Sequence, residues 1–178
     1  MSTHGQLTSA AAQSIMGELN RRGYDVYYDH GKKGDFVGKI AVSINKDLGR
    51  VKEISQMDIA VINKKSNKVI ALVEIEETTD NPKKLIGDIF SIIMGNSIHP
   101  PIREKVGVGE WTTLIIIGKG TRHDERNKYI LEMANNARPA MGTVNSSIGN
   151  IVIESFPDNG NLENTLMKQI DDAIQRNA

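Results

Sequence analysis

The chain lacks cysteine altogether among its 178 residues. Disulfides, zinc–thiolate sites, iron–sulfur clusters and cysteine nucleophiles are therefore excluded, and the composition is consistent with a reducing cytoplasm. Long apolar runs are also missing, because none approaches the roughly 18 residues that a membrane-spanning helix needs. The first residues lack the basic and then apolar segments of a signal peptide. We therefore expect a cytoplasmic protein with no membrane partner.

An excess of charge of either sign is absent too, since 22 Lys and Arg balance 22 Asp and Glu. This balance disfavours a protein that coats nucleic acid through bulk charge, so any such contact would use local patches. Candidate patches include Lys64, Lys65 and Lys68, and Arg103 with Lys105. Each patch is either a solvated surface or a wall that positions phosphates.

The remaining composition is that of an ordinary globular chain, with 39% hydrophobic and 25% charged residues. The length fits one domain spanning residues 1–178. Apolar periodicity and capping residues predict helices at 8–22, 82–95, 123–137 and 161–176. Aliphatic, β-branched runs predict strands at 24–29, 55–63, 68–77, 112–118 and 150–156, with a short strand at 40–44. We expect a mixed α/β domain, with 97–110 as a loop.

Acidic residues interrupt two of these apolar strands at their ends. Residues 69–73 are apolar on both faces of the predicted strand, which indicates an internal strand covered on each side. Glu74 and Glu76 then make one face acidic. In the preceding strand, Asp58 is the acid at the far end of an otherwise apolar face.

A hairpin would bring these acids together. If Asn63 pairs with Val69, leaving a five-residue loop, Asp58 lies opposite Glu74 with Cβ atoms roughly 5 Å apart. A loop with an even number of residues and no bulge would instead place the two side chains on opposite faces.

Neighbouring carboxylates repel one another, and a hard divalent cation relieves that repulsion. Magnesium prefers oxygen ligands and is typically held by one or two carboxylates together with substrate phosphate. The alternative is that Glu74 and Glu76 are solvated at the strand exit, with Asp58 paired to a lysine or a helix N-terminus. The pattern alone leaves both interpretations open.

The arrangement resembles the PD-(D/E)XK nuclease superfamily, which has the restriction-endonuclease-like fold. Met57-Asp58, fifteen intervening residues and Glu74-Ile75-Glu76 carry the resemblance, together with the helix–three strands–helix–strand order within 8–118. The resemblance implies an α/β fold with a mixed central sheet flanked by helices, an αβββαβ core followed by a C-terminal αβα extension. It also implies a homodimer that hydrolyses phosphodiester bonds in nucleic acid, double-stranded DNA more than RNA.

The family's site residues carry over as follows. Asp58, Glu74 and the backbone carbonyl of Ile75 would bind Mg²⁺ or Mn²⁺, and Glu18 matches a helix-borne glutamate that some members add to the metal site. Glu76 occupies the position of the usual lysine and would be a general base or a second metal ligand. The catalytic set is then Asp58, Glu74 and Glu76.

The missing lysine leaves alternatives open. Lys83 or Lys84 could supply a relocated cation that contacts nucleic acid, or both could be solvated. A catalytically inactive nucleic-acid-binding or assembly module of the same fold is the second hypothesis. A phosphohydrolase acting on small molecules is the third.

Overall fold

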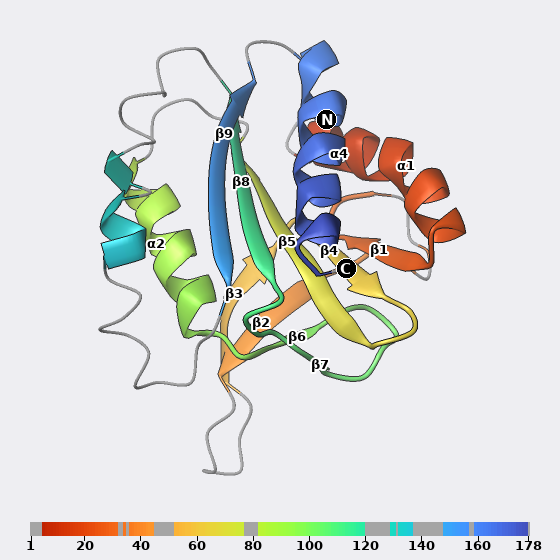
Figure 1. Ribbon diagram of the computed structural model, residues 1–178, viewed down its shortest axis with the longest axis horizontal. Coiled ribbons are helices and arrows are strands. Elements are labelled where there is room, and N and C mark those ends of the chain that lie inside the picture. Colours follow the sequence, from red (N-terminus) through yellow and green to blue (C-terminus); the bar gives the residue numbers. More distant parts are fainter. Residues whose placement is uncertain are drawn as a thin grey trace.

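The computed structural model describes residues 5–31, 34, 36–44, 52–76, 82–119, 129–130, 132–136, 148–156 and 159–177 (Figure 1). The helices are α1 (Gln6–Arg21), α2 (Pro82–Met94) and α4 (Asn159–Gln175), and residues 132–136 are also helical. The strands are β1 (Tyr24–Tyr28), β2 (Ile40–Ile44), β3 (Lys52–Met57), β4 (Ile59–Asn63), β5 (Lys68–Glu76), β6 (Ser97–His99), β7 (Val106–Gly107), β8 (Thr113–Lys119) and β9 (Asn150–Phe156).

A five-stranded sheet of order β1-β4-β5-β8-β9 forms the centre of the fold. β4 is antiparallel to both β1 and β5, whereas β8 is parallel to β5 and β9 is parallel to β8. The predicted mixed α/β architecture is therefore confirmed. A second sheet, of order β3-β2-β6-β7, lies beside it.

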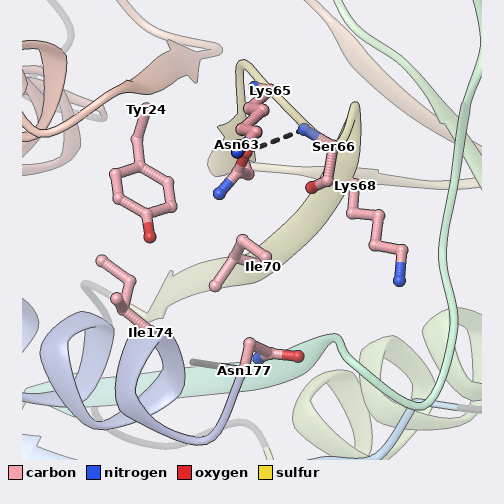
Figure 2. Close-up of a pocket in the computed structure, with 8 residues that line it drawn as sticks. All are labelled: Tyr24, Asn63, Lys65, Ser66, Lys68, Ile70, Ile174 and Asn177. Carbon is pink, nitrogen blue, oxygen red and sulfur yellow. Dashed lines mark hydrogen bonds between the residues drawn. The ribbon is translucent and has the colours of Figure 1, made fainter.

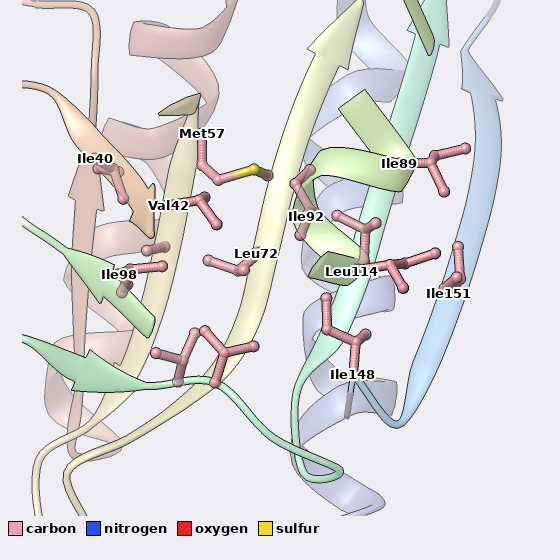
Figure 3. Close-up of a cluster of buried hydrophobic side chains, with 14 of the residues drawn as sticks. Ile40, Val42, Met57, Leu72, Ile89, Ile92, Ile98, Leu114, Ile148 and Ile151 are labelled. Carbon is pink, nitrogen blue, oxygen red and sulfur yellow. The ribbon is translucent and has the colours of Figure 1, made fainter. Parts of the chain in front are cut away.

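Both faces of the five-stranded sheet are covered (Figure 1). On one face, α1 and α4 bury a cluster that includes Leu19 and Leu166 against the strands. On the other face, α2 and the four-stranded sheet enclose a second cluster, which includes Leu72, Ile92 and Ile98 (Figure 3). Removing these aliphatic side chains from water stabilises the layers by roughly 1.5–3 kcal/mol for each fully buried residue.

The strand β5 lies in the interior of the sheet and is covered on both faces. All residues from Val69 to Ile75 are buried, as the apolar pattern on both faces predicts. Eight predicted elements agree with the structure to within two residues at either end, namely α1, β1, β2, β5, α2, β8, β9 and α4. The predicted helix at 123–137 is helical at residues 129–130 and 132–136, and its remainder lies outside the described residues.

Two of the predicted secondary-structure elements are wrong. The run 55–63 is not one strand, because the chain bends at Asp58 and leaves β3 in one sheet and β4 in the other. The predicted loop 97–110 contains β6 and the edge strand β7, which are too short to show an alternating pattern. Among the described helices, none combines the length and the apolar character needed to cross a membrane.

Candidate functional site

The register of the β4–β5 hairpin determines where the acidic residues lie. Asn63 pairs with Lys68, so the connecting loop has four residues, 64–67, and the predicted five-residue loop is wrong. A register shift between Val61 and Ile62 then adds one residue to β5, after which Ile59 pairs with Val73. The bulge compensates for the even loop, so positions 58 and 74 would be the next pair in this register, but the ladder ends at Ile59 and Val73 and the chain bends at Asp58.

Asp58 itself lies in the bend where the chain passes from one sheet to the other. Its Oδ2 accepts a hydrogen bond from the backbone nitrogen of Ile75 at 2.7 Å, and its backbone oxygen accepts one from the nitrogen of Asp29 at 2.9 Å. The carboxylate thus replaces the backbone partner that a continued β4 would have given to Ile75. The Asp58 side chain is only 14% exposed.

Glu74 is buried near the end of β5, with 9% of its surface exposed. It lines an open depression of about 390 Å³, together with Ser55 and Gln56 of β3 and Asp88 of α2. Glu53 also lines this depression and forms an ion pair with Lys39. The depression is therefore acidic and borders both sheets and α2.

Glu76 ends β5 in register with Gly118 of β8 and is half-buried. Strand alternation places its side chain on the same face of the sheet as that of Glu74. The predicted pair of acids at the strand end therefore lies on one face, toward the layer that contains α2 and the four-stranded sheet.

His30 is a neighbour of Asp58 that the sequence analysis does not identify. Its Nε2 lies 3.9 Å from a carboxylate oxygen of Asp58 and 3.9 Å from one of Asp29. The ring lies against the N-terminus of α1, because a Cβ on Gly5 would approach its Cγ to 2.3 Å. The signal is long-range: β1 pairs with β4 so that Tyr28 opposes Ile59, which brings the residues after β1 to Asp58.

Glu18 lies elsewhere. It sits near the C-terminal end of α1, its side chain is 53% exposed, and it pairs with Arg22 at 3.3 Å. Arg22 also donates to Asp171 of α4 at 2.7 Å, and this hydrogen bond raises the pKa of Arg22. α1 leads into the first residue of β1, whereas Asp58 lies beside the last residue of that strand, which is roughly 13 Å long.

Lys83 and Lys84 lie in the first turn of α2, and their side chains fall outside the described part of the structure. The positions of their ammonium groups relative to Glu74 are therefore not described.

The donor set decides whether a metal ion fits here. Within the described ranges, no group of three or more Asp, Glu or His side chains is arranged to hold a metal ion by itself. Magnesium does not require such a cage, because it keeps several waters and usually takes one or two protein carboxylates plus substrate phosphate. Asp58, which accepts from the Ile75 amide, and Glu74, the residue before Ile75, are the two candidate carboxylates for such an open site, but Asp58 is not among the described residues that line the depression beside Glu74.

Comparison of the chain with protein-family models, with curated proteins and with solved structures gave no match.

Proposed function

We propose that the chain is a metal-dependent endonuclease that hydrolyses phosphodiester bonds in nucleic acid, double-stranded DNA more readily than RNA. The observation that carries the proposal is the compensated register of β4 and β5. It restores the register in which position 74 comes next opposite position 58 after the last pair, Ile59 and Val73, and the Asp58 carboxylate accepts from the amide of Ile75, the residue after Glu74. β-Bulges are over-represented next to active sites.

The topology supports the same proposal. The strands of the five-stranded sheet follow α1 in the order β1, β4, β5, and α2 precedes β8, which is parallel to β5. When β2, β3, β6 and β7 of the other sheet are left aside, this order agrees with the αβββαβ core that the resemblance of Met57-Asp58 and Glu74-Ile75-Glu76 implies.

In this proposal Asp58, Glu74 and the carbonyl of Ile75 hold Mg²⁺ or Mn²⁺. The bound ion would lower the pKa of a water molecule and polarise the phosphoryl oxygen. The hydrogen bond from the Ile75 amide fixes the Oδ2 of Asp58, and the Oδ1 lies 3.9 Å from the Nε2 of His30. Ile75 therefore contributes through both its backbone groups.

Glu76 acts as the general base in place of the usual lysine. As a half-buried carboxylate on the face of Glu74, it is placed to accept the proton of the attacking water. Positioning of the substrate falls to basic residues at the cleft, for which Lys83 and Lys84 in the first turn of α2 are the candidates. A homodimer would give one such site for each strand of a duplex.

The second candidate is a nucleic-acid-binding or assembly module without catalysis. One observation favours it: the Asp58 carboxylate has a structural task, because it satisfies the amide of Ile75 where β4 ends. A residue retained for that hydrogen bond needs no metal. The module needs Asp58 only as the acceptor of the hydrogen bond from Ile75. The nuclease also needs its negative charge, to bind the metal ion.

A plasmid-nicking assay with Mg²⁺ or Mn²⁺ distinguishes the two functions. Asp58→Asn keeps an oxygen that accepts from Ile75 but removes the charge that a cation needs. We expect the wild type to nick DNA only with metal and the variant to lose activity by at least about 10²-fold, as removal of a charge-stabilising group does. Wild-type protein that binds labelled duplex without cutting it indicates the module instead.

The matched control is Glu163→Gln, which removes one acid from an exposed position on α4, on the opposite side of the sheet. It should nick DNA at the wild-type rate. Metal-dependent turnover of a simple phosphodiester, with no attack on DNA or RNA, would replace both proposals with a small-molecule phosphohydrolase.

A further inference from the structure

A second cavity lies at the other end of β5, on the face covered by α1 and α4. It has a volume of about 380 Å³, within the range of small-molecule sites. The β4–β5 turn and the C-terminal end of α4 form its walls (Figure 2). Six residues of β5, roughly 20 Å, separate Lys68 at its rim from Glu74. The cavity is therefore distinct from the acidic depression.

The polar groups of this cavity have fixed orientations. The Oδ1 of Asn63 accepts from the backbone nitrogens of Lys65 and Ser66, both at 2.9 Å, so its Nδ2 is turned toward the cavity (Figure 2). The Nδ2 of Asn177 donates to the carbonyls of Trp111 and Ala173, both at 2.8 Å, which leaves its Oδ1 as an acceptor. One wall thus offers donors and the opposite wall offers an acceptor.

The positive charge at the rim comes from Lys68. Its ammonium lies 4.3 Å from the centre of the Trp111 ring, and no carboxylate in the described part of the chain pairs with it. The nearby cations differ in this respect, because Asp25 pairs with both Lys64 and Arg103. Lys65 also lines the cavity, and no described carboxylate pairs with it either, so Lys65 and Lys68 are both available to an anionic ligand, and Lys68 is the one that lies against Trp111.

The floor of the cavity is apolar. Ile70 and Ile174 form it, and the ring of Tyr24 stands beside them (Figure 2). A flat ring with apolar faces can pack there, while its edge meets the acceptor of Asn177. Ser66, Asn63 and Lys68 all line the cavity, so their hydroxyl, amide and ammonium groups are the candidate partners of a phosphate attached to that ring.

We propose that this cavity binds a nucleoside monophosphate, with the phosphate at Lys68, Ser66 and Asn63 and the base on Ile70. The free nucleotide and the phosphorylated end of a nucleic-acid strand share this chemistry. The proposal goes beyond the endonuclease function and does not depend on it, because no residue of the cavity belongs to the acidic depression.

Isothermal titration calorimetry of the full chain with adenosine monophosphate in EDTA tests the proposal. We expect a Kd on the order of 0.1 mM, with at least about tenfold weaker binding of adenosine and of inorganic phosphate. Binding of adenosine as tightly as of the monophosphate would overturn it. A single-stranded oligonucleotide with and without a 5′-phosphate distinguishes a strand end from the free nucleotide.

Two variants assign the binding to the cavity. Asn63→Asp keeps the oxygen that accepts from the turn but replaces the cavity-facing donor with an oxygen, so affinity should fall at least about tenfold. Lys68→Gln removes the rim charge and should cost a similar factor. The control is Lys105→Gln, an exposed lysine outside the cavity, which should bind as the wild type does.

The same titration with Asp58→Asn separates this site from the proposed nuclease centre. Unchanged binding of adenosine monophosphate is expected, whatever the outcome of the nicking assay. Loss of binding in Asp58→Asn, or wild-type binding by folded Asn63→Asp and Lys68→Gln, would show that the nucleotide binds elsewhere and would overturn the proposal.

Discussion

The Oδ2 of Asp58 lies 2.7 Å from the backbone nitrogen of Ile75, across the end of the β4–β5 ladder. The last backbone pair of this ladder is that of Ile59 and Val73. A side chain thus completes the backbone pairing at the point where the main chain turns into another sheet. The same contact orients the carboxylate that the proposed metal site requires.

The first prediction separates these two tasks of Asp58. Asp58→Ala leaves the part-buried amide of Ile75 without its partner and should lower the free energy of unfolding by about 1.5–3 kcal/mol. Asp58→Asn retains an acceptor and should lose less than about 1.5 kcal/mol. Urea unfolding measures both values, and equal losses in the two variants would contradict the structural task.

The layered fold could be predicted because its signals are local. The chain alternates between a helical period and aliphatic runs of strand length, and β5 is apolar on both faces wherever helices cover it. Neighbouring elements in sequence pair in space, so the hairpin follows directly from the turn between Asn63 and Lys68.

The bend at Asp58 could not be predicted, because the surrounding run contains neither glycine nor proline. Met57 and Ile59 face different hydrophobic cores, which strict alternation forbids. The change of face is explained by the four-stranded sheet, which contains β3 but not β4. Two strands of that sheet, β6 and β7, lie more than thirty residues after Asp58 in the sequence. The contact of His30 with Asp58 depends likewise on distant pairing, that of β1 with β4.

The second prediction distinguishes metal binding from proton transfer at the acidic strand end. Glu74→Gln should weaken Mn²⁺ binding at least about tenfold, because an amide replaces a ligating carboxylate. Glu76→Gln should bind Mn²⁺ nearly as the wild type does but nick DNA about 10²–10⁴-fold more slowly, as loss of a general base does. Paramagnetic resonance of free Mn²⁺ gives the first quantity. Equal effects of the two variants on Mn²⁺ affinity would make Glu76 a ligand instead.

The third prediction concerns Glu18. Its exposed pair with Arg22 lies at the end of α1 that is remote from Asp58, so Glu18→Gln should leave both Mn²⁺ affinity and nicking unchanged. Stability should fall by less than about 1 kcal/mol, as for other exposed ion pairs. A tenfold loss of nicking in this variant would return Glu18 to the site and require α1 to move toward Asp58.

The fourth prediction uses two glycines of the same helix region. Gly5, at φ 80° before the first turn of α1, has no room for a Cβ, which would lie 2.3 Å from the Cγ of His30. Gly5→Ala should therefore cost about 1–2 kcal/mol for the left-handed backbone and displace the His30 ring. Gly17, inside the helix with open space around it, should gain about 0.5–1 kcal/mol as alanine. Thermal unfolding of the two variants should show opposite shifts, and shifts of the same sign would contradict the strain at Gly5 or the open space at Gly17.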